Sequence, residues 1–289
     1  MITHINDPNS DKCIVFIHGL GGSQKTFKNF SIYLNSNWTF NYGILLFYFS
    51  YYKNLFNSKL LYIIPKKLIF IIKAIWSKRN LHNAKKLKKY IDKYCNDSNN
   101  IILVAHSMGG LVARQFLVNC KKENVDIRNI RMLCTFATPH NGSHVARKIS
   151  VINKIPLLKN LYIFLSKKLG YRLSPQIGDL SNLSEFLDQL NKDWRDFNVE
   201  RDLKFIRIGG TKDKLVKVYS SNLHNDDLNN VFYYEYGHSE LISPLMNSVI
   251  FSPIDKFLEK LNFLEIQEEY FEELEEEINY DNEDDNEDY

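Results

Sequence analysis

The sequence has only four cysteines, and they are too scattered to form a disulfide framework. They stand singly, without a C-x-x-C pair, at Cys13, Cys95, Cys120 and Cys134. Small secreted domains that depend on disulfides carry cysteines at a much higher density. Residues 1–12 are polar, include Asp7 and Asp11, and lack the basic and apolar regions of a secretory signal. We therefore expect an intracellular protein with reduced thiols.

The sequence also lacks an uninterrupted apolar run of the length that spans a membrane. Its most apolar stretch, residues 60–76, is broken by Pro65, Lys66, Lys67 and Lys73, and charged side chains are costly inside a bilayer. From Lys66 to Lys78 the lysines fall on one helical face, opposite large apolar side chains. Such a helix lies in a membrane interface, covers an apolar cleft as a lid, or packs on the sheet as a plain surface helix. We expect residues 60–79 to contact an anionic membrane peripherally.

Basic residues are absent from the C-terminal end. None of the 37 Lys and Arg residues follows Lys260, whereas residues 265–288 hold 14 of the 34 acidic residues. The chain before Glu265 is therefore strongly basic, although the whole chain has a formal net charge of only +3. A basic body favours an anionic partner such as a phospholipid surface, or it is simply a solvated lysine-rich surface. We expect no nucleic-acid partner, and we predict a disordered acidic tail over residues 265–289.

Apolar runs alternate with helix-like segments along most of the chain. Strands are expected at 13–17, 42–49, 99–105, 130–137, 203–209 and 231–236, and helices at 26–34, 83–94, 111–118 and 252–264. This alternation predicts an α/β fold with a mostly parallel sheet and helices on both faces. At 289 residues we expect one domain, residues 1–264, before the tail. Helical cap or lid insertions are expected at about 53–80 and 145–195.

One expected strand ends at a serine on a sharp turn. Residues 101–105 are apolar, Ser107 is followed by Gly109 and Gly110, and residues 111–118 have a helical pattern. A strand, turn and helix in this order project a serine hydroxyl out of the sheet, where a base and a substrate both reach it. The motif is G-x-S-x-G with Ala105 in place of the first glycine. By itself it is weak, because a serine at such a turn also caps helices.

Three further loops at expected strand ends carry residues suited to the same chemistry. Strand 13–17 runs into His-Gly-Leu-Gly-Gly at residues 18–22, where glycines let backbone N–H groups approach a developing oxyanion. This loop lacks the G-x-G-x-x-G spacing and the acidic partner of a dinucleotide site. Asp213 follows strand 203–209, and His238 follows strand 231–236. Ligands of such a sheet bind at the carboxyl ends of its strands, where all four loops lie.

The chain order of oxyanion loop, Ser, Asp and His is that of the α/β-hydrolases. On this order, and on the motifs His-Gly-Leu-Gly-Gly, Ala-His-Ser-Met-Gly-Gly and Ala-Thr-Pro-His-Asn-Gly-Ser, the sequence resembles the lipase-like serine esterases of that superfamily. The branch that it resembles most includes GPI-inositol deacylase and the SERAC-type proteins. The similarity covers about Lys12 to Phe263. It implies an α/β-hydrolase fold with helical caps.

The resemblance also implies a role for each motif residue. Ser107 would be the nucleophile, His238 the general base, and Asp213 the residue that orients His238 and stabilises its charged form. The backbone N–H groups of Leu20 and Met108 would form the oxyanion hole. The mechanism requires no cofactor and no metal.

Several residues compete for these roles. Asp213 is preferred because it directly follows a strand in a Gly-x-x-Asp-x-x-Val frame; its rivals are Asp179, Asp188, Asp226 and Asp227. His224 is a rival of His238 but lies in a polar Asn/Asp loop. The histidines that belong to the motif loops are interpreted as structural hydrogen-bonding residues: His18, His106 and His140.

Together these features predict a serine hydrolase that cleaves a carboxylic ester through an acyl-enzyme on Ser107. The apolar caps and the basic amphipathic segment favour a lipid or another acyl ester as the substrate. Two alternatives stay open. The same triad serves an acyltransferase or a thioesterase, and a hydrolase fold also serves as a binding protein without turnover.

Overall fold

The computed structural model describes residues 4–5, 12–19, 22, 24–27, 43–47, 80–95, 100–144, 180, 184–223, 230–243, 252–254, 256 and 259. The chain divides into two compact units, Met1–Met246 and Asn247–Tyr289. In the second unit the described residues are helical, and they fall within the helix expected at 252–264. The proposed boundary between residues 264 and 265 stays a prediction. Both the basic segment 60–79 and the tail lie outside the described residues.

Among the described residues, seven strands form the sheet at the centre of the first unit, in the order β1-β3-β2-β4-β5-β6-β7. The strands are β1 His4–Ile5, β2 Lys12–Ile17, β3 Gly43–Phe47, β4 Asn100–His106, β5 Ile130–Phe136, β6 Lys204–Gly210 and β7 Val231–Tyr234. All neighbouring pairs are parallel except β1 and β3, which are antiparallel. This confirms the predicted α/β fold with a mostly parallel sheet. Two-residue β1 was not predicted, because it is too short to show an apolar alternation.

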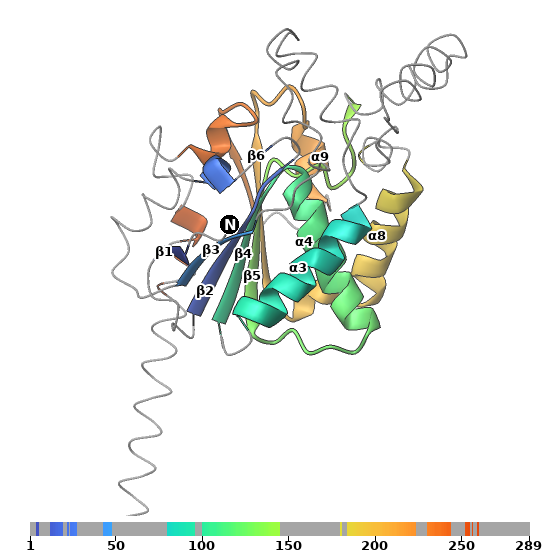
Figure 1. Cartoon of the computed structure of the whole chain (residues 1–289). Coiled ribbons are helices and arrows are strands. Elements are labelled where there is room, and N and C mark those ends of the chain that lie inside the picture. The colour runs from blue at the N-terminus through green and yellow to red at the C-terminus, as the bar shows by residue number, and fades with distance from the viewer. Residues whose placement is uncertain are drawn as a thin grey trace, which may run out of the picture. The chain divides into compact units, whose positions relative to one another are not determined.

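Three helices lie side by side against one face of the sheet (Figure 1). They are α3 Asn80–Tyr94, α4 Met108–Lys122 and α8 Glu185–Asp196. The central helix α4 has twelve of its 15 residues buried, because it contacts the sheet as well as both neighbouring helices. The shorter helical segments are η1 Gln24–Phe27, η3 Val199–Arg201, α9 Val218–Asn222 and η4 Glu240–Ile242.

The helix α8, Glu185–Asp196, overlaps the end of the range 145–195 that is predicted as a cap. Its Leu187, Leu190 and Trp194 are buried in the core, and Ser184 caps its first turn by accepting a hydrogen bond from the N–H of Leu187. This end of the range is therefore a core helix. Residues 145–179 and most of the first predicted insertion, 53–79, lie outside the described residues.

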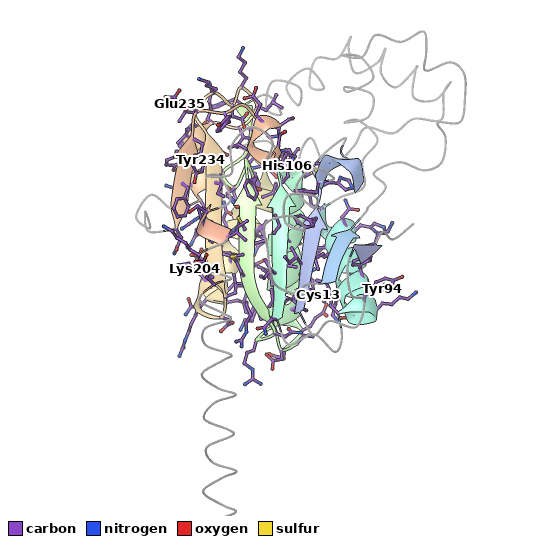
Figure 2. The ribbon with its side chains drawn as sticks, turned by 90° about the vertical axis from the view of Figure 1, so that its left-hand side faces the viewer. Cys13, Tyr94, His106, Lys204, Tyr234 and Glu235 are labelled. Atoms are coloured by element: carbon purple, nitrogen blue, oxygen red, sulfur yellow. The ribbon has the colours of Figure 1, made fainter. Side chains whose placement is uncertain are left out.

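The carboxyl ends of the parallel strands meet at one edge of the sheet. Figure 2 shows His106, at the end of β4, at the same edge as Tyr234 and Glu235 at the end of β7. Cys13 and Lys204, near the starts of β2 and β6, lie at the opposite edge. The carboxyl edge is therefore the place where the loops with chemically useful side chains assemble.

Candidate active site

Ser107 lies on the turn between β4 and α4 in a conformation that few non-glycine residues adopt. Its backbone angles are φ 54° and ψ −129°, and a positive φ brings the side chain into steric conflict with the backbone. Two contacts hold it there. The Ser107 N–H donates to the carbonyl of Phe136 at 2.8 Å, and the Thr138 hydroxyl donates to the carbonyl of Ser107 at 2.9 Å. The surrounding loops therefore fix the strained turn.

Glycine is needed on the α4 side of this turn because backbone and side-chain atoms of neighbouring loops lie very close. A Cβ atom on Gly109 would lie 2.3 Å from the carbonyl oxygen of Ile17, and one on Gly110 would lie 2.2 Å from the Thr138 hydroxyl. The Ser107 side chain makes no capping hydrogen bond to α4. The alternative interpretation of Ser107 as a mere helix cap is therefore wrong.

The structure brings Ser107, His238 and Asp213 together in one chain of hydrogen bonds. The Nε2 atom of His238 lies 2.9 Å from the Ser107 Oγ, and its Nδ1 lies 2.7 Å from the Asp213 Oδ2. A carboxylate only accepts hydrogen bonds, so Nδ1 carries the proton of the neutral imidazole. The Nε2 atom is then free to accept the serine proton.

The Asp213 carboxylate is fully buried at the end of β6. Its Oδ1 accepts hydrogen bonds from the N–H groups of Leu215 at 2.7 Å and Val216 at 3.0 Å. Burial alone would raise the pKa of this carboxyl, but the hydrogen bond of His238, the attraction of its protonated form and the two N–H groups outweigh burial and lower the pKa. The group is therefore charged at neutral pH. Of its rivals, Asp188 is exposed on α8, while Asp179, Asp226, Asp227 and the histidine rival His224 lie outside the described residues.

The loop histidines contact the site as hydrogen-bonding residues. The His106 Nε2 donates to the backbone carbonyl of His238 at 2.9 Å, and the two rings lie 4.8 Å apart. Burial, with repulsion from the protonated form of His238, lowers the pKa of His106 to about 3, so its ring is neutral. His18 donates from Nδ1 to the Gly19 carbonyl at 2.9 Å. Both agree with the structural interpretation.

His140 belongs to a buried network that the sequence did not reveal. Arg114 donates to its Nδ1 at 3.3 Å and to the Asn191 Oδ1 at 3.0 Å, and Asn191 in turn donates to the His140 carbonyl at 3.2 Å. Since Nδ1 accepts, Nε2 carries the proton and donates to the Thr135 hydroxyl at 3.2 Å. The network fixes the 138–144 loop, and with it the Thr138 hydroxyl on Ser107.

Of the two predicted oxyanion donors, the structure describes Met108. It is the first residue of α4, where backbone N–H groups have no carbonyl one turn earlier to bind. Leu20 lies outside the described residues, but Gly19 is described, and a Cβ atom on it would lie 2.7 Å from the Ser107 Cβ. The glycine loop therefore begins directly against the serine.

Among the described residues, no cluster of three or more His, Cys, Asp or Glu side chains is arranged to hold a metal ion. In the same part of the chain, no helix is both long and apolar enough to cross a membrane. All four cysteines lie within the described residues; each is buried, and none forms a disulfide.

A nucleophile turn on the central strand of a parallel sheet, with the order Ser, Asp and His along the chain, defines an α/β-hydrolase. Residues 9–223 match the family of PGAP1-like alpha/beta domains. The chain belongs to this family. The resemblance to lipase-like α/β-hydrolases that the motifs predicted is thereby confirmed.

Solved lipase structures share the fold. The mature lipase BlEst2 of Bacillus licheniformis superimposes with a TM-score of 0.55 at 16% identity, over 88% of this chain and 97% of that one. A lipase-esterase related protein of Clostridium acetobutylicum gives 0.54 at 16% identity, over 88% and 98%. In sequence, the chain is 45% identical to triacylglycerol lipase 2 of Saccharomyces cerevisiae over 62 residues. That match covers 22% of this chain and only 18% of the yeast protein.

Proposed function

We propose that the protein is a serine hydrolase that cleaves a carboxylic ester of a lipid through an acyl-enzyme. The observation that carries the proposal is the hydrogen-bonded chain from Asp213 through His238 to Ser107, with distances of 2.7 and 2.9 Å. Such a chain converts a weakly nucleophilic hydroxyl into a reactive one. The family match and the lipase names of the relatives support an ester substrate.

In the acylation step the Ser107 Oγ attacks the ester carbonyl carbon while His238 Nε2 takes the hydroxyl proton. Asp213 stabilises the resulting imidazolium by accepting a hydrogen bond from the Nδ1–H of His238. The oxyanion of the tetrahedral intermediate is stabilised by the N–H of Met108 and by the N–H of Leu20 in the glycine loop; one such donor is worth about 10² to 10³ in rate. His238 then gives its proton to the leaving alcohol, and the acyl group stays on Ser107.

Deacylation repeats these steps with water as the nucleophile. His238 takes a proton from the water, the hydroxide attacks the acyl carbon, and the fatty acid leaves as Ser107 regains its proton. An alcohol or a thiol in place of water would make the protein a transferase with the same residues. Products formed in the presence of alcohol acceptors distinguish the two reactions.

A lipid substrate also agrees with the expected contact of residues 60–79 with an anionic membrane. That contact is a separate part of the proposal. Flotation with vesicles that contain anionic lipid tests it, and a protein whose basic segment is neutralised should then float less.

The test of the reaction is fluorophosphonate labelling together with hydrolysis of p-nitrophenyl esters of increasing chain length. Wild type should label and should prefer long chains, whereas Ser107→Ala should do neither. Ser239→Ala is the matched control, because Ser239 is an exposed serine next to His238, and this variant should still label. A folded wild type that never labels would refute the proposal and favour a binding protein without turnover.

A further inference from the structure

Two exposed large apolar side chains lie on the segment that follows the triad aspartate, Leu215 in the loop and Tyr219 in helix α9. Only five such side chains are more than about a third exposed among the described residues. Leu215 is 37% exposed and Tyr219 is 49% exposed, and both follow Asp213 by at most six residues. Apolar side chains exposed next to a catalytic site are a feature of interaction surfaces.

Hydrogen bonds to two other parts of the chain fix the backbone of this segment, so its apolar side chains stay at the surface. The Ser143 hydroxyl donates to the Leu215 carbonyl at 2.8 Å, and the Asn141 amide donates to the Tyr219 carbonyl at 3.2 Å. The hydroxyl of Tyr219 is also hydrogen-bonded to His144. On the other side the N–H of Leu215 binds the triad carboxylate. Because these hydrogen bonds fix its backbone, the segment cannot rearrange to bury Leu215 and Tyr219.

Basic residues flank this apolar pair in the sequence. Lys214 and Lys217 are exposed, and within the described part of the chain neither forms an ion pair. Lys212 is paired with Glu235 at 3.2 Å, so its charge is partly compensated. The surface formed by Lys214, Leu215, Lys217 and Tyr219, here called the rim surface, therefore combines positive charge with apolar and aromatic groups.

This combination matches the chemistry of an anionic lipid surface. Leucine gains free energy by leaving water, tyrosine prefers the boundary where its ring is apolar and its hydroxyl wet, and lysine attracts lipid phosphates and carboxylates. We propose that the rim surface docks the protein on an anionic bilayer, with Leu215 and Tyr219 inserted at the interface and Lys214 and Lys217 on the headgroups. The proposal rests on a lipid substrate, because it brings the triad next to the surface from which the substrate comes.

The experiment measures binding of the full chain to vesicles in a Ser107→Ala background, so that no lipid is consumed. Vesicles of phosphatidylcholine alone are compared with vesicles that also contain phosphatidylserine. The protein should float with the second kind. The double variant Lys214→Gln and Lys217→Gln should reduce the partition coefficient about 25-fold, because each basic residue at an anionic surface contributes about fivefold.

A second double variant, Leu215→Ser and Tyr219→Ser, tests the apolar contacts. It should weaken binding even at a salt concentration that screens the lysines. The matched control lies on α3, where Leu81 is 45% exposed and Lys85 and Lys89 are exposed. A triple variant there, Leu81→Ser with Lys85→Gln and Lys89→Gln, combines both kinds of change and should leave binding close to that of the parent.

The proposal is overturned if the parent protein does not float with phosphatidylserine vesicles, if the rim variants bind as well as the parent, or if the α3 control loses binding to the same extent. Fluorophosphonate labelling of the otherwise wild-type chain separates this result from the proposed reaction. Labelling without vesicle binding refutes only the docking. Binding without labelling refutes the hydrolase and leaves the docking standing.

Discussion

Acid should destabilise this protein partly through one buried imidazole, that of His106. Its pKa falls from an ordinary value of 6.5 to about 3, mainly because the ring is buried. Between these two values the unfolded chain binds a proton that the folded chain does not bind. The free energy of unfolding therefore decreases as the pH falls below 6.5, by about 1.4 kcal/mol per pH unit from this group. Above that value the contribution is fully present.

The substitution His106→Gln isolates this contribution. Glutamine does not titrate, and its amide keeps a donor for the His238 carbonyl that His106 now binds at 2.9 Å. Between about pH 7 and about pH 5, wild type should lose about 2 kcal/mol more of its unfolding free energy than the variant loses. Urea unfolding at a series of pH values gives the unfolding free energies of both proteins. In their difference, the contributions of the titrating groups that the two proteins share cancel.

The control is His82→Gln, an identical change at an exposed position of α3. It shows the effect of the substitution away from the site. If wild type and His106→Gln lose the same free energy on acidification, burial does not hold His106 neutral, and the reasoning fails.

Three further substitutions give sharp expectations. Asp213→Asn should leave the fold and KM intact but lower kcat by about 10⁴, because the imidazole loses its orienting acceptor; steady-state kinetics would contradict this with a loss below tenfold. Thr138→Val keeps the side-chain shape but removes the hydrogen bond to the Ser107 carbonyl, so it should cost about 1 kcal/mol in urea unfolding and slow fluorophosphonate labelling; an unchanged labelling rate would refute a positioning role. Gly109→Ala places a Cβ against the Ile17 carbonyl and should cost about 1 to 3 kcal/mol, which thermal unfolding measures; a melting temperature equal to that of wild type would contradict it.

The sequence was sufficient to predict the strands that carry the site, because each is a buried apolar run that ends at a recognisable loop. Ser107, Asp213 and His238 are each the chemically distinctive residue directly after such a strand, and parallel strands bring their carboxyl ends together without further information. The order of these residues along the chain then limits the fold class. This part of the prediction depends only on local patterns.

Local sequence patterns do not predict contacts between residues that lie far apart in the chain. Arg114 and Asn191 are hydrogen-bonded although 77 positions separate them, and neither periodicity nor a motif pairs them. The helix α8 was placed in a cap because an amphipathic segment without neighbouring strands fits a lid and a core helix equally well. Thr138 is part of a quoted motif, but only the turn geometry shows that its hydroxyl binds the Ser107 carbonyl.

Because β7 lies at the edge of the sheet, the triad is complete only after this strand has joined the sheet. The bond between His238 and Ser107 joins residues 131 positions apart, and His238 reaches the serine only once β7 has paired with β6 at the edge. A chain that stops after β6 would keep its serine turn but would have no base. Fluorophosphonate labelling would therefore count only those molecules in which β7 has docked, which makes reactivity a stricter measure of complete folding than secondary-structure content.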